Sequence, residues 1–287
     1  MRDYIIITDS SCDLPVKKAE ELGIKAVPLE VNVEGEYSKL NCDIDIKEFY
    51  TMLRTKKTVT TSAVNIERFL TAFEEQLECG FDVLYIGFSS GLSSTFGAGK
   101  NAAEEMSEKY PDRKIIAVDS LSASLGQGLL VTLVARKQKE GATIEEAAKF
   151  AEETKWHLCH WFTVDDLFFL KRGGRVSAAT AVLGTMLAIK PVMHMDNEGH
   201  LINVAKARGR DASIKALFEH MKDSAIEPEK QTVYISHGDC YNEAKMLADM
   251  ITNEFGITDI LISEVGPVIG AHSGPGTIAL FFVGTQR

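Results

Sequence analysis

Serine and threonine hydroxyls gather in one short segment, Ser89–Thr95, whose sequence is SSGLSST. The apolar run Val83–Phe88 directly precedes this segment, and a helical pattern follows it to about Lys109. Because a strand delivers the segment and a helix leaves it, hydroxyls and helix N-terminal amides converge at one point. This geometry favours an anion such as a carboxylate or a phosphate. An ordinary serine-rich helix cap is the alternative interpretation.

A second hydroxyl cluster, Thr60–Ser62, precedes a predicted helix that begins near Asn65. Both clusters follow or flank strands that we assign to one sheet. Both can therefore lie at its carboxyl edge, where open α/β sheets bind their ligands. The two clusters together predict one anion-binding site.

A competing interpretation uses the same segment as a nucleophile. Residues 87–91, GFSSG, match the G-x-S-x-G elbow of serine hydrolases in the required strand–turn–helix setting. Ser89 would be the nucleophile, Asp119 the acid, and His237 or His272 the base. No HGGG-like oxyanion segment lies upstream, and the helix begins near Ser93 rather than directly after Ser89. A serine hydrolase or esterase is thus the alternative function.

Two further segments could face a ligand. Residues 181–189, AVLGTMLAI, are apolar on every side of a helix, which is typical of core packing or of a cavity wall. Gly266–Gly276 is predicted to be a glycine-rich loop that carries His272. The glycines permit close approach of the backbone to a ligand, and His272 could donate a hydrogen bond to an anion. The alternative is a structural loop in which His272 is hydrogen-bonded.

The bulk composition limits the function classes. A chain of 287 residues suggests two domains, and we place the boundary near residue 157, giving domains 1–157 and 158–287. The net charge of −10 disfavours nucleic acid as a partner. Five scattered cysteines without a CxxC pair indicate a reducing compartment, and no signal peptide or membrane-length apolar run is present. We therefore expect a cytoplasmic protein.

Short apolar runs alternate with amphipathic helices, which predicts an α/β fold. We expect a mainly parallel sheet with flanking helices in the N-terminal domain and a second α/β domain after it. A hairpin and further strands and helices follow after residue 157. The expected strands are Ile5–Thr8, Ala26–Val33, Val83–Phe88, Ile115–Val118, Leu158–Val164, Val192–Met195, Leu201–Ala205, Thr232–Ser236, Ile260–Val265 and Ile278–Val283. The expected helices include Pro15–Leu22, Ile46–Arg54, Asn65–Cys79, Ser122–Lys139, Ala178–Ile189, Ala212–Ser224 and Tyr241–Phe255, with a capping box at Thr143 and Glu146.

Taken together, the motifs resemble those of the DegV family along the whole chain and in the same order. The segments that carry the resemblance are Thr8–Leu14, Thr61-Ser62, Ser89–Thr95, Asp119-Ser120, Val164–Leu167, Gly173–Ser177, Lys190–Val192 and Gly266–Gly276. The resemblance implies a two-domain α/β protein that buries one long-chain fatty acid between its domains. It further implies a carrier without catalytic activity of its own, which presents the fatty acid to a fatty acid kinase for phosphorylation and phospholipid synthesis.

The resemblance also assigns roles to residues. Thr61 and Ser93, with the neighbouring Ser62, correspond to the hydroxyls at the fatty-acid carboxylate, and His272 to the histidine that supports this head group. Where the family usually has Thr-Ser-Gln-Pro, this chain has Ala63-Val64 after Ser62, which should alter the rigidity of the turn more than its hydroxyls.

Further residues are assigned to the contact with the kinase and to the lining of the acyl tail. Arg175 and Arg208 fall on family arginines that would face the kinase; solvated surface charges are the alternative. Leu183, Met186 and Leu187 are the candidates for the tail lining. We expect no metal and no cofactor besides the bound fatty acid, and a transient contact with a membrane surface. The carboxylate is expected near the protein surface, with the tail inside.

Overall fold

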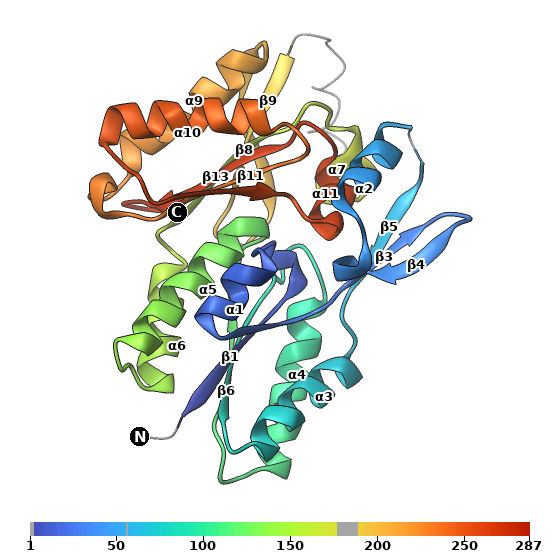
Figure 1. The fold of residues 1–287 in the computed structure, drawn as a ribbon, viewed down its shortest axis with the longest axis vertical. Helices are drawn as coiled ribbons and strands as arrows, with labels where there is room; N and C mark the ends of the chain where they lie inside the picture. The colour runs from blue at the N-terminus through green and yellow to red at the C-terminus, as the bar shows by residue number, and fades with distance from the viewer. Residues whose placement is uncertain (1–2, 56, 177–188) are drawn as a thin grey trace.

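The computed structural model describes residues 3–55, 57–176 and 189–287. Its first sheet is entirely parallel, with the strand order β2 (Ile24–Val27), β1 (Tyr4–Asp9), β6 (Asp82–Gly87) and β7 (Ile115–Asp119). The central strands β1 and β6 are almost wholly buried because helices cover both faces of the sheet. One face carries α3 (Ile66–Glu78) and α4 (Thr95–Lys109). The other carries α1 (Val16–Leu22), α5 (Ser124–Lys139) and α6 (Ile144–Thr154) (Figure 1).

A small antiparallel sheet lies beside the first one, with the order β4 (Tyr37–Leu40), β3 (Glu30–Val33) and β5 (Val59–Ser62). The helix α2 (Ile46–Arg54) connects β4 to β5. The single strand expected over residues 26–33 is wrong: it is divided into β2 and β3 at Pro28, which has no backbone N–H to donate to a sheet.

The second sheet has six strands in the order β10 (Leu201–Arg208), β9 (Ile189–Met195), β8 (Leu158–Thr163), β13 (Ile278–Val283), β11 (Val233–His237) and β12 (Ile260–Glu264). Only β11 and β12 pair in parallel; the other neighbours are antiparallel. The expectation of a mainly parallel sheet in the N-terminal half, followed by a further α/β region with a hairpin, is therefore confirmed. The helices α9 (Arg210–Ser224) and α10 (Tyr241–Phe255) pack against the second sheet.

The helix α5 lies between the two large sheets (Figure 1). Every residue from Ser124 to Ala135 is buried except the partly buried Leu133, as expected for a helix without a polar face. Its Leu125 and Leu129 belong to one hydrophobic cluster with Tyr234 of β11 and Phe281 of β13. The strands before and after residue 157 thus form separate sheets but share a core, and the predicted domain boundary remains a prediction.

Two local predictions change in the C-terminal half. The segment after Gly266 is not a loop but the helix α11 (Pro267–Ser273), which is favourable because proline fits the first turn of a helix. Ile189 begins β9 and Pro191 lies within that strand, so the predicted helix does not extend to Ile189. The rest of that predicted helix lies outside the described residues. The short helices are α7 (Phe168–Arg172), η1 (Ser10–Cys12), η2 (Asn41–Asp43) and η4 (Pro228–Lys230).

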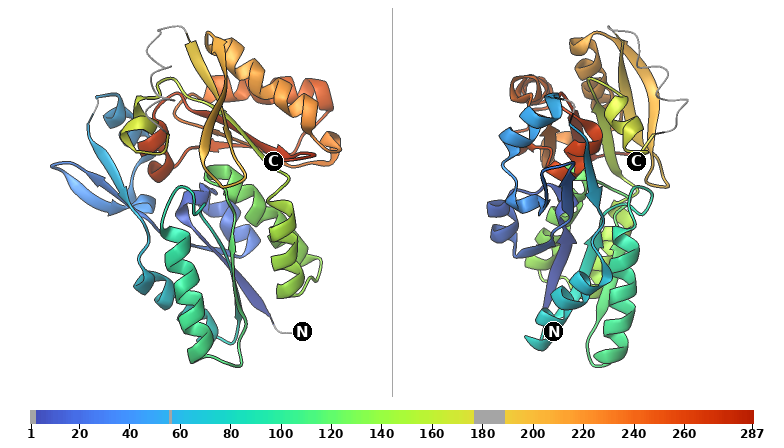
Figure 2. Two further views of the ribbon diagram at one scale, coloured as in Figure 1. Left: turned by 180° about the vertical axis from the view of Figure 1, so that it is seen from behind. Right: turned by 90° about the vertical axis from the view of Figure 1, so that its right-hand side faces the viewer.

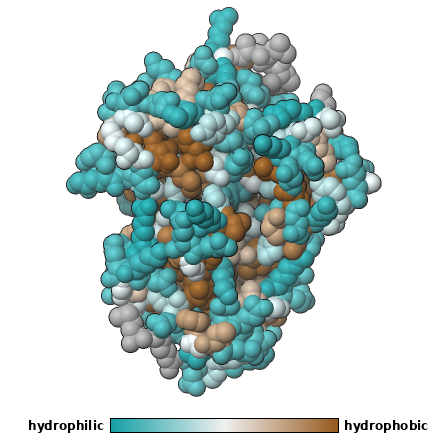
Figure 3. Space-filling model, in the orientation of Figure 1, coloured by the Kyte–Doolittle hydropathy of each residue, from teal (hydrophilic) through white to brown (hydrophobic). Residues whose placement is uncertain are grey.

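The view from behind and the side view place the second sheet and its helices at one end of the molecule, with the parallel sheet at the other (Figure 2). Teal, hydrophilic atoms cover most of the face in Figure 3, and brown apolar atoms gather in recesses between them. Among the helices that the structure describes, none is long and apolar enough to cross a membrane.

Candidate functional site

A cavity of about 280 Å³ lies where the two halves of the chain meet. Its walls come from β5, the β6–α4 turn and α5 of the first half, and from the second sheet, α7 and α11 of the other half. The polar lining is Thr61, Ser93, Ser94, Ser124, His160, Arg175, Ser236, His272, Ser273 and Thr277. The apolar lining is Leu29, Ala63, Phe88, Leu92, Ala123, Phe162, Leu170, Met195, Leu201, Val265, Val268, Ile269, Ala279 and Phe281.

Thr61 reaches the cavity from β5 rather than from a turn. The prediction that both hydroxyl clusters lie at the edge of one parallel sheet is thus wrong, because residues 60–62 belong to the antiparallel sheet. Successive residues of a strand point to opposite faces, so Thr61 and Ser62 diverge. Thr61 lines the cavity, whereas the Ser62 hydroxyl accepts a hydrogen bond of 3.0 Å from Asn32 Nδ2. Ser62 is not part of the described lining.

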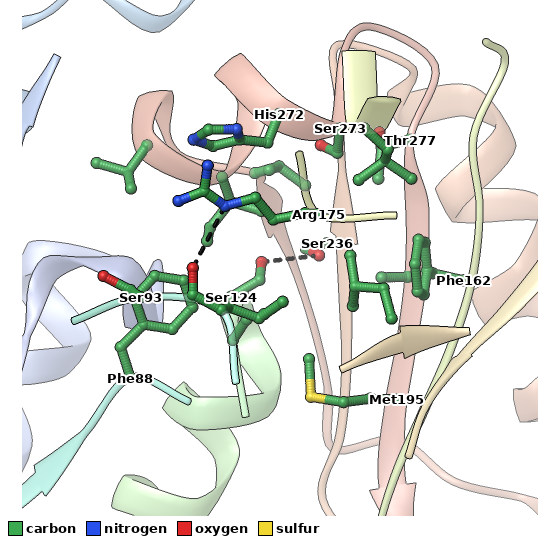
Figure 4. A pocket seen from close by; sticks show the side chains of 18 of the residues that line it. Phe88, Ser93, Ser124, Phe162, Arg175, Met195, Ser236, His272, Ser273 and Thr277 are labelled. Carbon is green, nitrogen blue, oxygen red and sulfur yellow. Dashed lines mark hydrogen bonds between the residues drawn. The ribbon is translucent and has the colours of Figure 1, made fainter. Parts of the chain in front are cut away.

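Ser93 lies in the turn between β6 and α4, as the sequence predicts. Its Oγ is 2.9 Å from Thr95 Oγ1 and accepts from the Thr95 N–H at 3.2 Å. The Ser93 hydroxyl therefore accepts the first N–H of α4, next to the N-cap residue Ser94, and Ser93 also lines the cavity. Phe88 and Ser93 lie on one side of the cavity in Figure 4, and Phe162 and Met195 lie on the other side.

The start of the β6–α4 turn is fixed by a carboxylate from the first strand. The Asp9 side chain is fully buried, and its Oδ2 accepts from the Phe88 N–H at 2.9 Å and from the Tyr85 hydroxyl at 3.1 Å. Burial raises the pKa of Asp9, and hydrogen bonds from Ser11, Phe88 and other donors oppose this shift. The Thr8–Leu14 motif thus supports the turn that carries Ser93, a role that the sequence alone did not indicate.

His272 enters the cavity from α11. Its Nε2 lies 2.8 Å from Thr61 Oγ1, so two of the predicted head-group residues come together from the two halves of the chain. Burial, together with the positive charges of Arg175 and Arg172, lowers the pKa of His272 to about 4. The imidazole is therefore neutral near pH 7. It packs tightly against Gly173, where a Cβ atom would lie 2.2 Å from His272 Nδ1.

Arg175 is half-buried at the cavity wall, which differs from the alternative interpretation of a solvated surface charge. Its assignment to a partner contact stays a prediction. Its Nε donates to the Leu92 carbonyl at 3.3 Å, and its NH1 donates to the Gly173 carbonyl. Arg175 is the only Arg or Lys in the described lining, and burial lowers the pKa of its guanidinium. Arg175 reaches this position because the chain turns at Gly173 and Gly174 directly after α7, which brings its side chain to Leu92 in the β6–α4 turn.

Arg208 is exposed at the end of β10 and is absent from the described lining. The predicted tail residues Leu183, Met186 and Leu187 lie outside the described residues.

The apolar wall that the structure does describe comes from many elements. For example, Thr277, directly before β13, and Ala279 and Phe281 within it line the cavity at every second position. Only this strand periodicity could have indicated them in the sequence.

The geometry around Ser89 does not support a nucleophile elbow. Ser89 is fully buried, and its hydroxyl donates to the Gly199 carbonyl at 2.9 Å. The proposed base His272 contacts Thr61 instead. The proposed acid Asp119 accepts from the backbone N–H groups of Ser90 and Leu121. Within the described ranges, Ser89 has no hydrogen bond to a histidine, so the hydrolase alternative has no assembled triad here.

Comparisons with known proteins agree with the fold. A DegV domain-containing protein of Clostridium perfringens is 44% identical, over 100% of this chain and 99% of that protein. The structure of a DegV family protein from Thermus thermophilus, described by its fatty acid binding, has 30% sequence identity and a TM-score of 0.87. It covers 98% of this chain and 99% of its own.

A second solved structure, DegV from Bacillus subtilis, is described as a fatty acid binding protein. It is 28% identical, covers 98% of this chain and 99% of its own, and has a TM-score of 0.86. The family model for DegV proteins matches residues 4–285. The chain is therefore a member of the DegV family.

Proposed function

We propose that this protein binds one long-chain fatty acid in the cavity between its halves. The carboxylate lies at Thr61, Ser93 and His272, and the acyl tail runs along the apolar lining. The observation that carries this proposal is the convergence of these three side chains on one cavity whose remaining wall is mostly aliphatic and aromatic. The similarity to fatty acid binding DegV structures over almost the whole chain supports it.

The tail and the head group contribute differently to binding. A tail of about 14 to 16 methylenes gains ~11–13 kcal/mol at ~0.8 kcal/mol each, before the costs of ordering the ligand. The tail therefore supplies most of the affinity. A carboxylate buried without donors would cost several kcal/mol, so the hydroxyls of Thr61 and Ser93 are needed to place it. The Arg175 guanidinium adds the positive charge that favours an anion at this end of the cavity.

The proposal extends to a partner. The protein presents the bound fatty acid to a fatty acid kinase, which phosphorylates the carboxylate for phospholipid synthesis, and contributes no catalytic group itself. The exposed Arg208 is suited to an electrostatic contact with the kinase, whereas Arg175 is suited to contact both kinase and ligand. All five cysteines are free, which suits the reducing cytoplasm. Loading from a membrane surface by transient contact completes this scheme.

The test is mass spectrometry of the purified protein, native and then denatured, with extraction of the released lipid. We expect one fatty acid per chain. The double substitution Thr61→Ala with Ser93→Ala should retain much less lipid. The matched control is Ser62→Ala, because the neighbouring hydroxyl contacts Asn32 and not the cavity. A wild-type protein without lipid, or a double variant that retains as much as the wild type, would overturn the proposal.

A further inference from the structure

The tip of the β9–β10 hairpin rests on the turn that carries Ser93. The contact is made by Ser89, whose buried hydroxyl donates to the Gly199 carbonyl at 2.9 Å. The same hydroxyl accepts from the Gly91 N–H at 3.2 Å. The GFSSG segment, which resembles a nucleophile elbow, thus contacts a segment more than a hundred residues away in the chain. We call Ser89–Gly91, the part that contacts the hairpin tip, the seat.

The hairpin tip has a defined shape of its own. The Asp196 carboxylate accepts from the N–H groups of Glu198 and His200, each at 2.9 Å, and the Gly199 N–H donates to the Asp196 carbonyl at 3.0 Å. Gly199 has a φ of +75°, which favours glycine. Gly199 is buried, whereas Asn197, Glu198 and His200 are exposed. The tip therefore buries only the residue that meets the seat.

The two surfaces approach more closely than a side chain would allow. A Cβ atom on Gly91 would lie 2.6 Å from the Glu198 carbonyl oxygen and 2.8 Å from that of Gly199. A Cβ atom on Gly199 would lie 2.1 Å from Ser89 Oγ. Since the atoms opposite Gly91 belong to the backbone, a methyl group there would force the tip and the seat apart.

Both sides of this contact continue directly into the cavity wall. Met195 and Leu201, which flank the tip, line the cavity from the hairpin. Leu92 and Ser93, which follow the seat, line it from the other half of the chain. The backbone N–H of Ser93 also donates to the Ser89 carbonyl at 3.1 Å. The position of Ser89 is therefore transmitted to Ser93 through one hydrogen-bonded turn.

We propose that docking of the Asp196–Gly199 tip on Ser89 and Gly91 holds Ser93 in place for the fatty-acid carboxylate and holds the hairpin against the cavity. Ser89 and Gly91 are thus positioning residues that act through Ser93. This inference rests on the proposed fatty acid binding and adds the residues that set its head-group selectivity.

The experiment compares Gly91→Ala and Ser89→Ala with Gly97→Ala. Gly97 is exposed on α4 and has no heavy atom within 4 Å of the added Cβ, so this control tests an added methyl in the same segment. Equilibrium binding of palmitic acid and of hexadecanol, which has the same chain without the carboxylate, is measured for each delipidated protein. Melting temperatures are recorded in parallel.

We expect palmitic acid to bind about tenfold more weakly to both seat variants, since a hydrogen bond to a charged group is weakened. Hexadecanol binding should fall clearly less, and Gly97→Ala should match the wild type for both ligands. Unchanged palmitic acid binding in the seat variants, or equal losses for acid and alcohol, would refute the positioning role while fatty acid binding stands. If the wild type binds no fatty acid, the proposed function and this inference both fail.

Discussion

Thr61 Oγ1 and His272 Nε2 lie 2.8 Å apart although 211 positions separate them in the chain. Thr61 comes from the small antiparallel sheet, and His272 comes from α11 near the C-terminus. The pair therefore exists only when both halves of the chain are folded against each other. The proposed carboxylate site is for this reason a property of the whole chain.

The first prediction concerns acid stability. The pKa of His272 is lowered to about 4 by burial, below its usual 6.5, so the folded state resists protonation. The contribution of the neutral His272 to the free energy of unfolding is therefore complete above pH 6.5 and is lost as the pH falls through 6.5 toward 4. His272→Gln should remove this loss. Urea unfolding at pH 7 and pH 5 should show a smaller acid-induced decrease in the variant, by about 2 kcal/mol. Equal decreases would contradict the assigned burial of the imidazole.

The second prediction concerns the same imidazole with ligand bound. A carboxylate next to His272 favours the charged imidazole, so fatty acid binding should raise the pKa of His272 above about 4. An NMR titration of the histidine ring protons, with and without palmitic acid, measures this shift. A His272 titration that does not respond to the ligand would place the carboxylate elsewhere in the cavity.

The third prediction concerns Asp13, whose pKa is raised to about 7 because the carboxyl is buried. Its Oδ2 accepts from Ser124 Oγ at 2.6 Å, and Ser124 Oγ lies 3.2 Å from Ser236 Oγ of the other half. The folded state keeps this proton up to about pH 7, whereas the unfolded chain releases it near pH 4. Stability from this group is therefore lost as the pH rises from 4 to 7.

Asp13→Asn removes this titration. We expect the melting temperature of the variant, relative to the wild type, to be higher at pH 8 than at pH 5. The measurement is calorimetry of both proteins at the two pH values. Ser62→Ala, which affects no titrating group, is the control. A constant difference between variant and wild type at the two pH values would argue against a raised pKa of Asp13.

The fourth prediction separates the two arginines. Arg175→Gln removes the only positive charge of the described lining and should weaken palmitic acid binding by about tenfold, with little effect on hexadecanol. Arg208→Gln should leave lipid binding unchanged, because Arg208 is exposed at the end of β10. With a partner kinase at saturating lipid, Arg208→Gln should slow phosphorylation of the fatty acid. Lipid binding by displacement of a fluorescent fatty acid and kinase turnover are the two readouts.

The fifth prediction concerns the acyl tail. Ala279 lies on β13 between Thr277 and Phe281, and all three side chains face the cavity. Ala279→Leu fills part of the space that the tail requires, so the variant should retain shorter fatty acids than the wild type. Mass spectrometry of the extracted lipids gives the chain lengths. An unchanged chain-length distribution would show that the tail does not pass this position.

Local patterns in the sequence were sufficient to predict many of the helices and strands. The helices α2 and α10 have the predicted bounds, and the capping box of Thr143 and Glu146 is present at the start of α6. These features depend on apolar spacing and on side chains three residues apart. The break at Pro28 and the additional strand β4 were missed because short, half-exposed strands carry a weak pattern.

Contacts between distant segments explain the remaining differences. The placement of Arg175 at the cavity depends on the approach of α7 to the β6–α4 turn, which no local pattern encodes. The divergence of Thr61 and Ser62 follows from strand alternation, but only after their strand is known. The resemblance to a family located Thr61, Ser93 and His272 in the sequence, whereas the structure was needed to see that they share one cavity.

The burial of α5 between the two sheets has a consequence for synthesis on the ribosome. The helix is complete once residue 139 has emerged, yet its partners Tyr234 and Phe281 follow about a hundred or more residues later. Until then, an apolar face of the nascent chain remains open to water and to other chains. The apolar surface of α5 therefore stays exposed to water, or bound by a chaperone, until β13, the last strand, has been translated.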